Sequence, residues 1–422
     1  MQKIKTDSTE IEIGRIENLI ILSILPIIFL ISAFLLDTPA NILKGLYSII
    51  ISSDVLLVDY LEVGGIGATF VNAALLALIN IFIIYKLKLK LNGALIAAIF
   101  TITGFSFFGK NIFNVWPIYI GGYLYAKYQK IEFKSVLVVI MFSTSLAPII
   151  NEIAFGLNTN ILFSLPIAIL FGIFIGFVIT PLSSHMLRTH DGYNLYNIGL
   201  TAGILGMLIT SLLRSFGFVI EPQQVLSTKY DLFLKIFFFI LFLLLIILGY
   251  FINNKSFKGY KKILKFSGRL VTDFTQLKGY GITYINMGIM GIVSLAYAIS
   301  LGGVLNGPIV GALLTVVGFG AFGKHLRNAL PIMLGVALGA FIKIWDIDST
   351  AVILAGLFGT TLAPIAGEFG PIIGLIAGFL HLSVVMNVGV VHGGINLYNN
   401  GFAGGFVAAI LVPIIDAFKK GD

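Results

Sequence analysis

The sequence consists of two similar copies in tandem, and this internal duplication constrains the fold more than any other feature of the sequence. Early motifs recur at a constant distance of 214 residues, and later motifs return in the same order. The main pairs are Asn92-Gly93 and Asn306-Gly307, Phe108-Gly109-Lys110 and Phe322-Gly323-Lys324, Thr144 to Glu152 and Thr360 to Glu368, and His190 to Asn197 and His392 to Asn399. In an apolar chain, such a duplication is typical of transporters, whose substrate path lies where the two copies meet.

The composition identifies an integral membrane protein. Hydrophobic residues make up 58% of the chain, charged residues 11%, and the mean hydropathy is +1.02. A soluble domain has about 45–50% apolar and about 25% charged residues. Apolar runs such as 19–35 and 162–179 approach the roughly 17–25 residues of a membrane-spanning helix. The absence of Cys excludes disulfides, thiolate metal sites and cysteine nucleophiles, and we expect no metal and no cofactor.

The positive charges predict an orientation rather than a nucleic-acid partner, despite a net charge of +8. We expect seven apolar segments per copy, near 18–36, 63–85, 93–108, 113–127, 135–153, 162–180 and 193–213, then 231–252, 279–299, 305–322, 328–343, 350–368, 371–389 and 395–416. With a cytoplasmic N-terminus, 21 of the 27 Lys and Arg residues fall in inner loops, Lys324 among them. The six outside are Lys44, Lys110, Arg214, Lys229, Lys235 and Lys343. This bias predicts a multi-pass protein of the cytoplasmic (inner) membrane with both termini in the cytoplasm.

An odd number of segments per copy predicts that the second copy enters the membrane from the opposite face. The expected fold is therefore an all-α polytopic membrane protein of two inverted-topology repeats, with some segments short, broken or re-entrant. We place the first repeat at 1–214, an external linker at 215–230 and the second repeat at 231–422. The basic segment 253–278 is cytoplasmic and either lies on anionic lipid headgroups or serves only as an orientation signal.

Two short apolar runs are candidates for the solute path. One begins at Asn92 and ends at Lys110, and the other begins at Asn306 and ends at Lys324. They form either half-helices that end inside the membrane, with unpaired backbone groups, or tight helical hairpins. A lysine near the end of a half-helix either attracts an anion or snorkels to the membrane interface.

Pro148 and Pro364 should break the helices that contain them, because proline removes a backbone hydrogen bond and clashes with the preceding turn. Glu152 and Glu368 follow four residues later. A carboxylate at membrane depth should face a cavity or a partner. The alternative is that both glutamates lie at a loop edge.

The most polar repeated motif precedes the last helix of each copy. Its candidate residues are His190, Asn194, Tyr196 and Asn197 in the first copy and His392, Asn396, Tyr398 and Asn399 in the second. These side chains suit a neutral polar solute or a proton relay, or else Asn and Gly simply cap and turn the helix start. We expect Glu152, Glu368, His190, His392, Asn92 and Asn306 to gather near the pseudo-two-fold axis.

One stretch of each copy resembles the urea transporters. Asp59-Tyr60 is followed by Gly64 and by Phe70-Val71-Asn72, and Asp273-Phe274 is followed at the same spacing by Tyr284-Ile285-Asn286. Asn92-Gly93-Ala94-Leu95-Ile96 is similar to a further segment of that family. The resemblance covers roughly 55–126 and 269–340. It implies a narrow pore between re-entrant helices, Asn72 and Asn286 in the path, and one pore per subunit of a homotrimer, with a dimer as the alternative.

The sequence also departs from the urea transporters, because Ala73, Ala74 and Gly67 replace their second Asn, their Pro and their pore Gln. The whole chain is more similar to an uncharacterised family of two-repeat bacterial membrane proteins with a His-x-Gly-x-Asn-Leu-Tyr-Asn motif. Membership would imply fold and membrane location without a substrate.

These patterns favour membrane transport of a small polar solute, by channel-like diffusion or by an ion- or proton-coupled cycle. The main alternative is a membrane-embedded enzyme, such as a hydrolase that uses His and Glu. A third class is a structural or assembly subunit. Every candidate residue occurs twice in equivalent positions, which favours a path over the single asymmetric site of an enzyme.

Overall fold

The computed structural model describes residues 14–156, 160–220 and 222–418. Within them, nine helices are long and apolar enough to cross a membrane, and a pair of helices bent by 48° at Pro148 forms either a tenth, broken span or a re-entrant loop. The first copy comprises α1 (Arg15–Leu36), α2 (Pro39–Ile51), α3 (Tyr60–Val63), α4 (Gly65–Lys86), α5 (Gly93–Phe105), α6 (Trp116–Tyr128), α7 (Leu137–Ser143), α8 (Pro148–Asn151), α9 (Ile161–Thr189) and α10 (Asn197–Ser215). The second comprises α11 (Asp231–Ile252), α12 (Tyr260–Ile263), α13 (Phe274–Ser300), α14 (Gly307–Phe319), α15 (Leu326–Ile342), α16 (Thr350–Gly359), α17 (Ala363–Phe369), α18 (Pro371–Val388) and α19 (Asn399–Phe418). The all-α, two-repeat membrane fold predicted from the sequence is confirmed.

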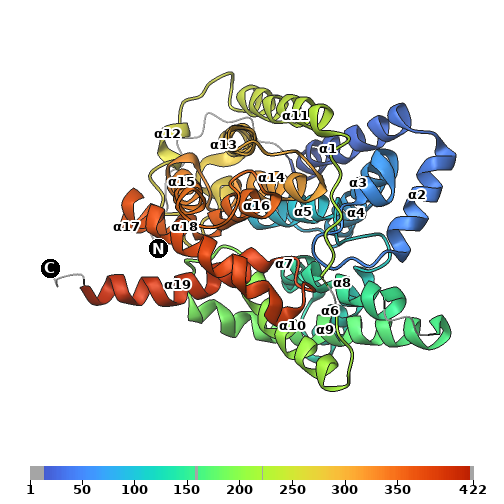
Figure 1. Ribbon diagram of the computed structural model, residues 1–422. Coiled ribbons are helices and arrows are strands. Elements are labelled where there is room, and N and C mark those ends of the chain that lie inside the picture. Colours follow the sequence, from blue (N-terminus) through green and yellow to red (C-terminus); the bar gives the residue numbers. More distant parts are fainter. Residues whose placement is uncertain (1–13, 157–159, 221, 419–422) are drawn as a thin grey trace.

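Helices α5 and α14 are equivalent half-helices at the centre of the molecule (Figure 1). Each has 13 residues, and at about 1.5 Å per residue neither reaches across a hydrocarbon core of about 30 Å. Their residues are buried on all sides, so lipid contacts neither of them.

The two half-helices run antiparallel. A Cβ atom built on Gly104 would lie 2.7 Å from the carbonyl oxygen of Gly311, and one built on Gly318 would lie 2.6 Å from the Cβ of Phe100. The end of α5 therefore lies beside the start of α14, and the start of α5 beside the end of α14. Antiparallel packing of equivalent helices is the arrangement that inverted repeats produce.

The remaining helices surround this pair in matching sets. Helix α1 packs on α4 as α11 packs on α13, and α6 packs on α9 as α15 packs on α18. Helices α10 and α19 meet near their starts, where Gly199 lies against Gly401. Figure 1 shows α9, α10 and α19 together in the lower part of the view.

The structure shows which of the seven predicted apolar segments per copy are short. The segments 93–108 and 305–322 are half-helices, and 113–127 contains only the 13-residue helix α6. Helix α2 lies in a stretch for which we predicted no span; the Thr38 side chain caps it and Pro39 begins it.

The helix around Pro148 is bent by 48°, whereas Thr350–Phe369 around Pro364 forms one span with only a local 3₁₀ turn. Each proline follows a short 3₁₀ turn, Thr144–Leu146 in the first copy and Thr360–Leu362 in the second. Each lies in the first turn of the next helix, where its missing N–H costs no helical hydrogen bond.

Candidate functional site

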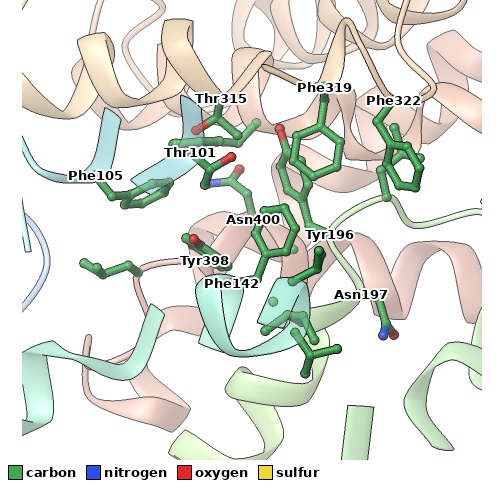
Figure 2. A pocket seen from close by; sticks show the side chains of 18 of the residues that line it. Thr101, Phe105, Phe142, Tyr196, Asn197, Thr315, Phe319, Phe322, Tyr398 and Asn400 are labelled. Atoms are coloured by element: carbon green, nitrogen blue, oxygen red, sulfur yellow. The ribbon is translucent and has the colours of Figure 1, made fainter. Parts of the chain in front are cut away.

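A cavity of about 150 Å³ lies between the two copies (Figure 2). Its wall is built mainly from pairs of equivalent residues, one from each copy. The pairs are Thr101 and Thr315, Phe105 and Phe319, Phe142 and Phe358, Leu195 and Leu397, Tyr196 and Tyr398, and Gly199 and Gly401. Equivalent residues of inverted copies share one cavity only around the axis that relates the copies, so the cavity lies on the pseudo-two-fold axis.

The aromatic rings of this wall pack across the copies. The ring centroid of Tyr196 lies 4.7 Å from that of Phe319, and that of Tyr398 lies 4.8 Å from that of Phe105. Figure 2 shows these four rings around the cavity together with Phe142. Such edge and tilted contacts fix the ring positions, so the cavity has a defined shape.

Two threonines place hydroxyl oxygens in the wall. Thr101 donates its hydroxyl proton to the carbonyl of Ala97, and Thr315 donates to that of Gly311, both at 2.7 Å. Both hydroxyl protons are therefore used in hydrogen bonds to backbone carbonyls of α5 and α14. Each hydroxyl oxygen keeps lone pairs that can accept a hydrogen bond from a solute.

The histidines of the repeated polar motif hold their own loops in place. His190 Nε2 lies 3.0 Å from Asn197 Oδ1, and His392 Nε2 lies 2.9 Å from Asn399 Oδ1. Both histidines are buried. The cavity is lined by Asn197 but by neither histidine, so the histidines position the motif rather than contact a solute in this cavity.

The other asparagines of the motif join the two copies. Asn194 Nδ2 donates to the carbonyl of Gly401 at 3.0 Å, and Asn396 Nδ2 donates to that of Gly199 at 3.2 Å. The Asn194 side-chain oxygen also accepts from the Thr361 hydroxyl at 2.6 Å. These bonds fix the tyrosines that follow in the cavity wall.

Behind the tyrosines lie two buried lysines. Lys110 Nζ donates to Tyr398 Oη at 2.7 Å, and Lys324 Nζ donates to Tyr196 Oη at 2.5 Å. Both lysine side chains are fully buried. The predicted positions of Lys110 outside and of Lys324 in an inner loop, and the snorkelling alternative, are therefore wrong, because each ammonium group is enclosed between the copies.

Asn72 and Asn286 hold the chain that carries these lysines. Asn72 Nδ2 donates to the carbonyls of Ser106 and Lys110 at 2.8 and 2.9 Å. Asn286 Nδ2 donates in the same way to Gly320 and Lys324 at 2.7 and 2.8 Å. The two asparagines pair the backbone carbonyls at the ends of the half-helices, and neither is in the cavity wall.

The predicted gathering of six residues near the axis is wrong for four of them. Asn92 and Asn306 cap the starts of α5 and α14, which lie at opposite ends of an antiparallel pair. Glu152 is buried and accepts from the Ser53 hydroxyl at 2.5 Å, whereas Glu368 is exposed. Equivalent residues of the two copies do not necessarily lie close together, because the pseudo-two-fold axis places residues that are far from it on opposite sides of the protein.

One buried carboxylate breaks the symmetry. Asp54 accepts from the side chains of Asn111 and Asn114, each at 3.0 Å. In the second copy Gly268 takes the place of Asp54, and His325 takes the place of Asn111. His325 Nε2 lies instead 2.8 Å from the carbonyl of Phe266.

Sequence reasoning missed several residues of the site. Phe142 and Phe358 stand two residues before the repeated Thr144 and Thr360, so their recurrence was the available signal. Asn400 lines the cavity, and its Oδ1 lies 3.0 Å from Nε2 of the buried His381. This pair has no counterpart in the first copy, so the duplication could not reveal it. Among residues 14–156, 160–220 and 222–418, no three His, Asp or Glu side chains are placed to hold a metal ion.

The fold and the cavity define a multi-pass membrane protein built of two equivalent copies around one axial cavity. The chain matches the model of the family DUF1576, described as a protein of unknown function, at residues 38–215 and again at 252–417. These segments span most of the chain, which therefore belongs to that family. Searches of curated proteins and of solved structures returned no match. The resemblance to urea transporters stays a prediction.

Proposed function

We propose that the protein transports a small solute across the membrane through the axial cavity. The observation that carries this proposal is the composition of the wall, in which equivalent residues of both copies surround one space. Inverted-repeat transporters bind their solutes at the repeat interface, near mid-membrane, beside interrupted helices. The half-helices α5 and α14 supply such interruptions here.

The solute should be small, and few polar groups of the wall can contact it. The cavity of about 150 Å³ is walled by seven aromatic rings, and its polar groups are few: the hydroxyls of the paired threonines and tyrosines and the amides of two asparagines. Apolar walls with a small number of placed polar groups are typical of sites that select a solute by size and orientation.

The enzyme alternative has less support. A hydrolase needs a nucleophile beside a general base, but the cavity wall is formed by no Asp, Glu or His among the described residues. His190 and His392 each lie against an asparagine amide. The paired residues of the wall come from both copies, which favours a path along the axis over one asymmetric site.

The test is solute entry into liposomes that contain the purified full-length chain. Shrinkage and re-swelling after mixing with urea, glycerol, formate or acetate is followed by light scattering. We expect at least one solute to enter faster than into protein-free liposomes. Thr101→Phe and Thr315→Phe, which fill the cavity, should slow that entry, whereas Thr228→Phe at an exposed position should not.

Two results would decide against the proposal: entry rates equal to those of empty liposomes for every solute, or entry that both cavity-filling variants leave intact while they still fold. Repeating the assay with imposed proton or sodium gradients separates a coupled carrier, whose uptake follows a gradient, from channel-like diffusion, whose uptake follows only the solute.

A further inference from the structure

Lys110 and Lys324 are two buried lysines that flank the cavity from opposite copies. Each follows the end of a half-helix, each is fully buried, and each donates to a tyrosine hydroxyl of the wall. Their ammonium nitrogens lie over the same rings, 4.7 Å from the Tyr398 centroid and 4.4 Å from the Tyr196 centroid. The two arrangements repeat each other across the axis.

Neither lysine has an acidic partner. In the part of the chain that the structure describes, the two ion pairs are Lys134 with Glu132 and Lys235 with Asp231. The contacts of Lys324 are instead the hydroxyls of Tyr196 and Thr360. A structural lysine buried at membrane depth is normally paired, because an uncompensated charge there costs several kcal/mol.

When both are protonated, two lysines without an acidic partner give the cavity beside them a positive potential. The surrounding wall is apolar and aromatic, and charges act more strongly in such a low-dielectric environment than in water. Rings of Lys or Arg produce anion selectivity in membrane pores in the same way. A tyrosine hydroxyl that accepts from an ammonium group keeps its own proton for donation, so Tyr196 and Tyr398 can extend the positive field into the cavity.

We infer that the transported solute is a small anion, whose charge replaces the missing counter-ion of Lys110 and Lys324. This inference rests on the proposed transport function. The cavity of about 150 Å³ has room for a halide or a short carboxylate, and the aromatic edges, which carry partial positive charge, suit the flanks of such an anion. The positive potential excludes cations.

The experiment uses liposomes that contain the full chain, with chloride, formate and acetate as anionic probes, urea as the neutral probe and sodium as the cationic probe. A membrane potential set by a potassium ionophore drives charge movement. We expect anion entry that follows the imposed potential and a reversal potential that follows the anion gradient. Lys110→Met and Lys324→Met should each lower anion entry by about tenfold or more, since one unit of charge removed from a low-dielectric site raises the barrier by at least about 1.4 kcal/mol.

The controls separate this inference from the proposal on which it rests. Lys258→Met removes an exposed lysine and should leave anion entry unchanged, and Lys110→Arg keeps the charge if a Met variant fails to fold. Entry of urea but of none of the anions would contradict the inference of an anionic solute without contradicting the proposed transport function. No entry of any probe would overturn transport itself. Wild-type anion entry in folded Lys110→Met and Lys324→Met proteins would remove the lysines from the mechanism.

Discussion

The carboxylate of Asp59 accepts the backbone N–H of Gly307 at 3.0 Å, although the two residues belong to different copies. Asp273 accepts the N–H of Gly93 at the same distance. Each aspartate thus meets the positive end of the other copy's half-helix, where a negative charge is stabilising. The two copies exchange helix caps, and this exchange fixes how they pack.

Asp59→Ala should destabilise the protein by about 3 kcal/mol, because it leaves the buried N–H groups of Gly307 and Ser227 without their charged acceptor. The midpoint of thermal unfolding in detergent measures the effect. Glu62→Ala removes an exposed carboxylate from the adjacent turn and should change the midpoint little. Equal effects of the two substitutions would contradict the capping role.

Gly104→Ala should cost about 1–3 kcal/mol of stability, the usual range for overpacking. The added methyl would lie 2.7 Å from the carbonyl oxygen of Gly311, a backbone atom that cannot turn aside. Gly206→Ala is the matched control, since its nearest neighbour would lie at 3.4 Å. A Gly104→Ala protein as stable as the control would mean that α5 and α14 lie further apart.

Asn72→Leu should cost about 2–4 kcal/mol, because two buried carbonyls lose their donor while the volume of the side chain is kept. Asn387→Leu, at an exposed position on α18, serves as the comparison. If Asn72 contacted the solute instead of the backbone, the substitution would change the transport rate while the unfolding midpoint stayed in place.

Lys44 and Lys258 occupy equivalent positions, 214 residues apart, and both are exposed. In inverted repeats they lie on opposite faces of the membrane, with Lys258 expected in the cytoplasm. Because the chain has no Cys, Lys44→Cys and Lys258→Cys can be labelled singly in intact cells and in inside-out vesicles with an impermeant thiol reagent. Labelling of both from the same side would exclude inverted topology.

Phe142→Ala and Phe358→Ala should widen the cavity to a similar extent, because the two rings take equivalent places in its wall. We expect each variant to admit larger solutes than the wild type does, measured as entry rates for a size series in liposomes. Phe174→Ala, on an exposed part of α9, is the control. A change in only one of the two variants would show that the path follows one copy rather than the axis.

Much of the fold could be predicted, because repeated motifs, the lengths of apolar runs and the positions of prolines can be recognised without knowing which residues meet in space. The half-helices, the bend at Pro148 and the tyrosines of the repeated motif could be found in this way. Recurrence of a residue also identified Lys110 and Lys324 as candidates, although counting them as loop charges misplaced them.

The partners of these residues could not be predicted, since each lies in the other copy. Spacing within one copy does not indicate that Tyr196 meets Lys324 or that Asp59 meets Gly307. The glutamates show the converse limit, because Glu152 and Glu368 recur as faithfully as the tyrosines but lie away from the axis. Distance from the axis depends on the packing of whole helices.

The exchanged caps also bear on how the protein is made. Helix α5 begins at Gly93, but the carboxylate that completes it belongs to Asp273, 180 residues later in the chain. During synthesis the first copy therefore enters the membrane with α5 capped by Asn92 but with the Gly93 N–H still lacking its carboxylate acceptor, and that bond forms only after the second copy has emerged. Neither half is a finished protein by itself, so a gene cut between the copies would need both products in the same membrane to restore either one.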